Sequence, residues 1–140
     1  MMGKAVILSL APKYAKAIYE GRKHWEFRTV PPPVGLDVFI YETAPVCRVT
    51  GGVHFGYAVS GIPEFVWTVV KSLGHYHGRG MNKPGISREE FIRYCHTKDG
   101  RRRGTVTALR ILTQLKWDKA MPLPIGMRPP QNWQYFKIND

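Results

Sequence analysis

The sequence predicts an α+β fold in which a mostly antiparallel sheet closes into a small β-barrel flanked by two or three α-helices. Several segments alternate apolar and polar residues as half-buried strands do, whereas others carry apolar residues at helical spacing. The chain has 140 residues, of which 44% are hydrophobic, enough for one core and too few for a second. We therefore expect residues 1–140 to form a single domain.

The first elements are a strand and a helix. Residues 5–10 are apolar, and we interpret them as a buried strand rather than as the hydrophobic stretch of a signal peptide. Pro12 suits the first turn of a helix, and Gly21 can end that helix in a left-handed conformation. The helix is therefore predicted to run from Pro12 to Glu20.

The octapeptide GRKHWEFR follows this helix and places one carboxylate among basic and aromatic side chains. Its alternation predicts a strand with Trp25 and Phe27 on one face. The other face then carries His24, Glu26 and Arg28. We expect the acid and its basic neighbours to share that face.

The remaining elements follow from alternation, apolar stripes and a capping sequence. Ser87 and Glu90 form a capping box, which predicts the start of a helix that runs to about Cys95. An apolar stripe predicts another helix over 62–73. Strands are expected at 36–43, at 53–60, at 105–117 as one strand or two joined at a bulge, and within 129–138.

The charge of the chain indicates its class of partner. With 21 Lys and Arg against 10 Asp and Glu, the formal net charge is +11, which favours a polyanion, with nucleic acid ahead of an anionic membrane. No apolar run approaches the roughly 18 residues of a membrane span. Cys47 and Cys95 lack disulfide or zinc spacing, so we expect free thiols and a cytoplasmic location.

Two loops carry concentrated basic or titratable residues. The Gly-rich segment 74–85 contains His75 and His77, which could contribute metal ligands, but no companion ligand pattern follows. We favour a phosphate-facing loop there, and we predict no metal site and no cofactor. The arginines at 101–103 are expected to make salt-sensitive phosphate contacts.

Four segments carry a resemblance to a known family: LSLAPKYAKAIYEGRKHWEFR, VFIYETAPV, GISREEFIRYC and PPQNWQYF. Their order resembles the ASCH family, a branch of the PUA-like β-barrels. The family motif G-x-K-x-x-E-x-R is met by Gly21, Lys23, Glu26 and Arg28. The resemblance implies a PUA-like fold that binds RNA, or nucleic acid more generally, in a cleft beside the barrel and regulates transcription or translation.

Within such a cleft, Lys23 and Arg28 can donate to phosphates or to base carbonyl groups. There are three hypotheses for Glu26: it orients the two cations, it accepts a hydrogen bond from the amino group of a base, or it acts as a general acid or base. We favour the orienting salt bridge, which is compatible with base contact. The candidate binding residues are Lys13, Lys23, His24, Glu26, Arg28, Tyr41, Thr43, Arg88, Tyr94, Arg101, Arg102 and Arg103.

The leading interpretation is therefore a regulatory protein that binds single-stranded RNA or modified nucleotides. The first alternative is a ribonuclease in the same cleft, with Lys23 and Glu26 as catalytic residues. A second is the N4-acetylcytidine amidohydrolase that some small ASCH proteins resemble, although Glu26 occupies the position of their threonine. A third is a basic adaptor that binds protein through an exposed apolar patch.

Overall fold

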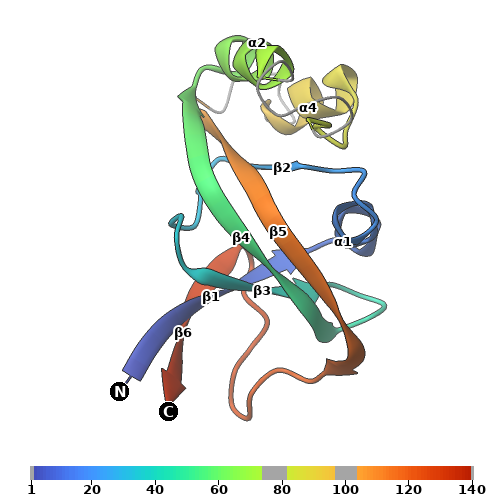
Figure 1. The fold of residues 1–140 in the computed structure, drawn as a ribbon, viewed down its shortest axis with the longest axis vertical. Coiled ribbons are helices and arrows are strands. Elements are labelled where there is room, and N and C mark those ends of the chain that lie inside the picture. The colour runs from blue at the N-terminus through green and yellow to red at the C-terminus, as the bar shows by residue number, and fades with distance from the viewer. Residues whose placement is uncertain (1, 74–81, 97–103, 140) are drawn as a thin grey trace.

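The computed structural model describes residues 2–73, 82–96 and 104–139, and Figure 1 shows the arrangement of the elements. Long strands cross the molecule diagonally, with two helices at one end and a third beside the sheet. The strands are β1 (Met2–Leu10), β2 (Trp25–Arg28), β3 (Asp37–Glu42), β4 (Arg48–Gly61), β5 (Val106–Met121) and β6 (Trp133–Asn139). The helices within the described residues are α1 (Pro12–Tyr19), α2 (Pro63–Ser72) and α4 (Arg88–Tyr94).

The six strands form one sheet in the order β2-β5-β4-β3-β1-β6. Only the pairing of β1 with β3 is parallel, so the prediction of a mixed α+β fold with a mostly antiparallel sheet is confirmed. The predicted closed barrel is wrong, because among the described strands β2 pairs only with β5 and β6 pairs only with β1. The sheet is therefore open between these two edges.

Side chains bridge the gap that a barrel would close with backbone hydrogen bonds. The Arg28 guanidinium, at the end of β2, donates to the Asn132 side-chain oxygen, immediately before β6, at 2.6 Å. The Asn132 amide and the indole N–H of Trp133 both donate to the Val30 carbonyl at 3.1 Å. This seam leaves polar side chains at the edge of the sheet, where the candidate site lies.

Helix α1 lies between β1 and β2 in the chain and covers one face of the sheet. As predicted, Pro12 is at its start, and Gly21 follows it with a φ of 74°, a left-handed conformation that glycine adopts without a steric penalty. Ala15, Ala17 and Ile18 are its buried residues. The helix is therefore fixed by an apolar face and defined ends, and it delivers the chain directly to Lys23 and β2.

The core is divided between the two faces and the helical end of the sheet. One cluster packs α1 against the central strands through Leu8, Ile18 and Ile40. A second cluster joins β2 to α2 and α4, and in it the Phe27 and Phe91 rings meet edge to face at 4.9 Å between centroids. Trp25 also belongs to the second cluster. The apolar face predicted for β2 is therefore the surface on which α2 and α4 pack.

The predicted strands 53–60 and 105–117 lie within the longer strands β4 and β5, although burial along β5 follows its two halves and does not alternate. β5 is one strand of 16 residues, and its register against β4 shifts at bulges. Ser87 caps α4 by accepting the Glu90 backbone N–H at 3.0 Å, as the capping box predicts. The Glu90 carboxylate, however, turns to Lys13 on α1. No helix in the described ranges combines the length and apolar composition that crossing a membrane requires.

Candidate nucleic-acid-binding pocket

A solvent-open cavity of about 240 Å³ lies between α1, β2 and α4. β1 and the start of α1 supply one wall, β2 supplies the floor, and α4 supplies the opposite wall. Its polar lining contains both cations and the acid of the predicted motif. The lining residues are Ser9, Leu10, Ala11, Tyr14, Lys23, Glu26, Phe27, Arg28, Ile86, Glu90 and Tyr94.

Lys23 is only 2% exposed, although its side chain lines the cavity. Its Nζ donates to the Pro84 carbonyl at 3.1 Å and lies 3.8 Å from a Glu26 carboxylate oxygen. The Tyr14 and Phe27 rings lie beside the ammonium, with centroids 5.5 and 5.1 Å from Nζ. Burial lowers the pKa of Lys23, and the neighbouring Glu26 charge only partly opposes that shift. Lys23 therefore loses its proton more easily than an exposed lysine.

Glu26 is the carboxylate that holds the two cations in place. Its Oε2 accepts from Arg28 Nε at 3.3 Å and from an Arg28 terminal nitrogen at 3.0 Å, a two-contact pair with a planar guanidinium. Its Oε1 accepts the Phe27 backbone N–H at 3.2 Å and faces Lys23. Glu26 itself is 5% exposed. The orienting role favoured from the sequence therefore matches the geometry.

Arg28 connects the pocket to the seam of the sheet. Besides Glu26, its guanidinium donates to the Ser9 carbonyl at 2.8 Å and to Asn132. A guanidinium has five N–H groups, and the four contacts to Glu26, Ser9 and Asn132 occupy four of them. One donor thus remains for a ligand, judged from the residues that the structure describes.

The rim of the pocket joins α1 to α4. Lys13 Nζ lies 3.2 Å from a Glu90 carboxylate oxygen, and it also lies over the Tyr14 ring at 4.7 Å. Across the pocket, the Tyr94 hydroxyl accepts the Thr29 backbone N–H at 2.9 Å. Two partly exposed tyrosines, Tyr14 and Tyr94, therefore line the cavity around the buried charges.

Several residues predicted for the site lie elsewhere. His24 is buried and does not line the cavity, and its Nδ1 accepts the Lys83 backbone N–H at 3.0 Å. Tyr41 packs in an apolar cluster on the other face of the sheet, and Thr43 and Arg88 do not line the cavity. The period-two pattern correctly paired Glu26 with Arg28. His24, which precedes the first residue of that short strand, does not line the cavity with them.

The predictions for the two basic loops concern residues outside the described part of the chain. His75 and His77 belong to segment 74–81, and the three arginines belong to segment 97–103, both of which lie outside the described residues. Among the residues that are described, no group of three or more His, Cys, Asp or Glu side chains could hold a metal ion.

The structure adds residues that the sequence interpretation did not assign to the site. Ser9 contributes its carbonyl to Arg28, and Asn132 contributes its side chain from a segment more than 100 residues away. Glu90 had been assigned only a capping role, yet it lines the pocket and pairs with Lys13. Asn132 was present in the segment PPQNWQYF that carried the family resemblance, but nothing in that segment indicates its partner.

Comparison with known proteins agrees with the predicted resemblance. No protein-family model matches the chain. A curated protein of Zymomonas mobilis named ASCH domain-containing ribonuclease is 27% identical over 139 residues, covering 96% of this chain and 85% of that protein. The crystal structure of ASCH from the same bacterium superposes with a TM-score of 0.68 at 24% identity, covering 94% of this chain and 87% of that chain.

A crystal structure of a serine-to-alanine variant of that protein also gives a TM-score of 0.68, at 25% identity. It covers the same 94% of this chain and 87% of the variant chain. The sequence similarity therefore extends over nearly the whole chain, and the fold agrees over the same range. These comparisons confirm the resemblance predicted from the sequence motifs: over nearly its whole length the chain is similar to an ASCH domain-containing protein, in sequence and in fold.

Proposed function

We propose that the protein binds single-stranded RNA, with one unstacked or modified nucleotide entering the pocket of Lys23, Glu26 and Arg28. The observation that carries this proposal is the buried charge cluster at the floor of a solvent-open cavity. Proteins that bind single-stranded RNA recognise unstacked bases through aromatic side chains and polar groups, and this pocket contains both. A related protein named as a ribonuclease supports RNA as the class of ligand.

The donors of the pocket suit a phosphate or a carbonyl oxygen of a base. Arg28 retains one N–H group, and Lys23 retains donors beyond the one it gives to Pro84, as judged from the described contacts. The Glu26 carboxylate keeps lone-pair capacity for the amino group of cytosine or adenine. Because Glu26 contacts both cations, we assign it mainly the role of orienting the Lys23 and Arg28 side chains.

We expect the protein to be a single domain that regulates transcription or translation by binding RNA.

Binding can be tested by fluorescence anisotropy with labelled single-stranded RNA, double-stranded RNA and single-stranded DNA at two salt concentrations. Loss of a hydrogen bond between charged groups costs about 1.5–3 kcal/mol. We therefore expect Lys23→Ala to weaken binding of single-stranded RNA by about 10- to 150-fold. Lys137→Ala, on the exposed surface of β6, is the control and should stay within about twofold of wild type.

Two results would contradict this proposal. One is the absence of RNA binding by the wild-type protein at low salt, where phosphate contacts are strongest. The other is an equal loss of affinity in the Lys23 and Lys137 variants. Circular dichroism of each variant must show an intact fold, because Lys23 is buried.

Ribonuclease activity is the second candidate, and two observations favour it. The relative from Zymomonas mobilis is named a ribonuclease, and burial lowers the pKa of Lys23. A neutral Lys23 amine could take the proton of an RNA 2′-hydroxyl. The 2′-oxygen would then attack the adjacent phosphorus, the bond to the 5′-oxygen would break with protonation of that oxygen, and a 2′,3′-cyclic phosphate would form.

Cleavage is measured with end-labelled single-stranded RNA in the presence of a metal chelator. We expect cyclic-phosphate products from the wild-type protein and none above background from Lys23→Gln. Intact RNA after prolonged incubation with the wild-type protein would exclude this candidate and leave the binding proposal standing. The amidohydrolase alternative gains no support, because no threonine side chain is among the described residues that line the cavity.

A further inference from the structure

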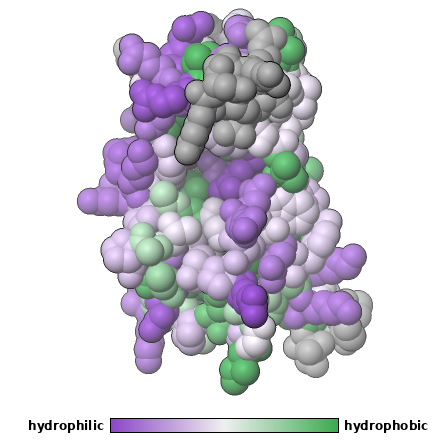
Figure 2. Space-filling view, turned by 180° about the vertical axis from the view of Figure 1, so that it is seen from behind, coloured by the Kyte–Doolittle hydropathy of each residue, from purple (hydrophilic) through white to green (hydrophobic). Residues whose placement is uncertain are grey.

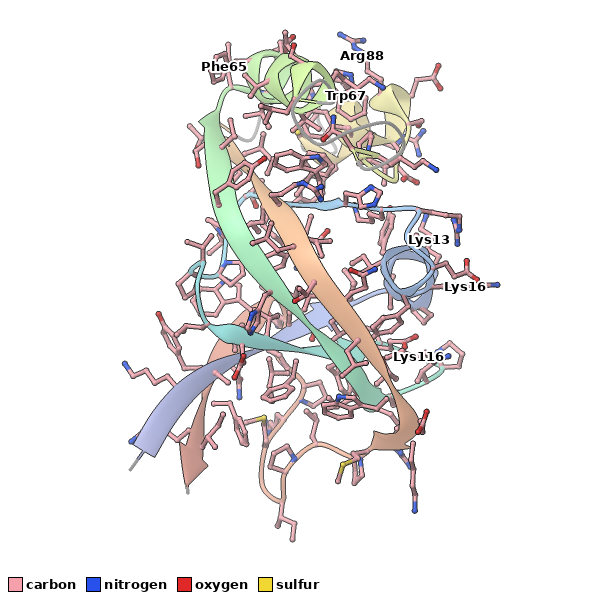
Figure 3. All side chains as sticks on the ribbon, viewed as in Figure 1. Lys13, Lys16, Phe65, Trp67, Arg88 and Lys116 are labelled. Atoms are coloured by element: carbon pink, nitrogen blue, oxygen red, sulfur yellow. The ribbon has the colours of Figure 1, made fainter. Side chains whose placement is uncertain are left out.

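A row of lysines runs along the flank of the molecule from the rim of the pocket to the part of β5 that pairs with the first residues of β4. Figure 3 labels Lys13 and Lys16 on α1 and Lys116 on β5, and all three lie on the same side of the molecule. Each of the three is exposed. Figure 2 shows this flank from behind, on its left, where hydrophilic side chains are prominent. The row begins at the pocket, because Lys13 pairs with its rim residue Glu90.

Helix geometry and a second hollow connect the three lysines. Lys13 and Lys16 are three residues apart, so they lie on the same side of α1 with an axial rise of about 4.5 Å between them. Beyond the helix, Lys16 and Lys116 both line a hollow of about 400 Å³. Helix α1 lines both this hollow and the pocket, through Lys16 and Tyr14 respectively. Lys13 therefore lies beside the pocket, through its pair with Glu90, and Lys16 and Lys116 line the neighbouring hollow.

Two carboxylates also line the hollow, and one of them has a cationic partner that does not line it. Arg22 binds Glu20 at 2.6 Å, and Arg22, followed by Lys16 and Lys116, lowers the pKa of Glu20. Glu42 is the second carboxylate. Neither Lys16 nor Lys116 forms an ion pair within the described part of the chain. Both ammonium groups are exposed and act on Glu20 only through the longer-range field of their charges, so a phosphate from solution can contact them.

We propose that an RNA strand leaving the pocket crosses α1, and that its backbone phosphates contact Lys13, Lys16 and Lys116. This inference rests on the proposed function, and it identifies a second, sequence-independent contact surface for the same ligand. Lysine ammonium groups on long side chains suit phosphates as point charges and carry no base information. Short RNA fills the pocket alone, whereas longer RNA also reaches the lysine flank.

The test compares two RNA lengths and two double variants of equal charge. Lys16→Gln with Lys116→Gln removes two positive charges from the flank. The control, Lys4→Gln with Lys137→Gln, removes two positive charges from exposed residues that lie opposite each other on β1 and β6. These two strands run away from α1 toward the chain termini. Lys13 is left intact because its ion pair with Glu90 would complicate the result. The probes are a trinucleotide and a single-stranded RNA of about 12 nucleotides, within the range of such binding surfaces.

Each phosphate contact on a single strand contributes about 0.7 to the slope of log affinity against log salt. With the longer RNA, we expect the flank variant to lower that slope by about 1.4, and the control variant to leave it within about 0.3 of wild type. The affinity for the trinucleotide should be unchanged in both variants. An unchanged slope in the flank variant, or an equal fall in the control, would overturn the inference.

The variant Lys23→Ala separates this inference from the proposed function. If trinucleotide binding falls in Lys23→Ala while the flank variant keeps its salt slope, only the lysine path is wrong. If the trinucleotide binds equally well to Lys23→Ala, the pocket is not the binding site. If the wild-type protein binds neither RNA, both proposals fail.

Discussion

Glu26 is the buried carboxylate that holds both pocket cations, and replacing it with glutamine tests the electrostatics of the site. Glutamine has nearly the same shape but removes the negative charge between Arg28 and Lys23. The side chains of Arg28 and Glu26 are 14% and 6% exposed, and their atoms meet at 3.0 Å. The substitution therefore leaves two largely buried cations without their counter-charge.

Breaking a buried ion pair by removing one partner costs about 3–5 kcal/mol. Arg28 keeps its hydrogen bonds to Ser9 and Asn132, and the cavity admits solvent, so we expect the lower end of that range. Glu26→Gln should thus lower the free energy of unfolding by about 3 kcal/mol. For a chain of this length, the melting temperature should fall by roughly 10 °C.

Urea unfolding followed by circular dichroism measures this change through the midpoint at a constant m-value. Glu20→Gln is the matched control, because it removes a carboxylate whose pair with Arg22 is exposed to solvent. We expect no measurable shift in the control. A loss below about 1 kcal/mol in Glu26→Gln would mean that Lys23 and Arg28 do not depend on Glu26, which contradicts the orienting role.

Three further predictions concern Lys23 and the helix beside it. Because burial lowers the pKa of Lys23, the unfolded chain binds more protons between that lowered pKa and about 10.4, and stability should rise with pH there by up to about 1.4 kcal/mol per unit. Urea unfolding across that range should show a weaker rise of stability with pH in Lys23→Met than in the wild-type protein. Equal slopes would mean that folding does not lower the pKa of Lys23. Ser87→Ala should cost about 1 kcal/mol in the same assay, because the Glu90 N–H loses its acceptor. Gly85→Ala should destabilise the protein and weaken RNA binding, because its φ is 82° and a Cβ would overlap the Lys23 side chain; wild-type behaviour would contradict this packing.

Local sequence patterns were sufficient where neighbouring residues decide the structure. The ends of α1 follow from Pro12 and Gly21, because Pro12 fixes its own φ and Gly21 adopts a left-handed φ without a steric penalty. The cap of α4 follows from Ser87 for the same reason. The pairing of Glu26 with Arg28 also follows, since residues two apart on a strand share a face.

The sequence alone thus determined the mixed fold class, the ASCH resemblance and the charge pair within β2. Only the tertiary structure decided that the sheet stays open, because closure depends on whether β2 meets β6, two segments more than 100 residues apart. The same holds for the contacts of Arg28 with Ser9 and Asn132 and for Glu90 at the pocket rim. Strand alternation carries no information about which distant side chain fills a gap, and that choice determines the shape and the charge of the pocket.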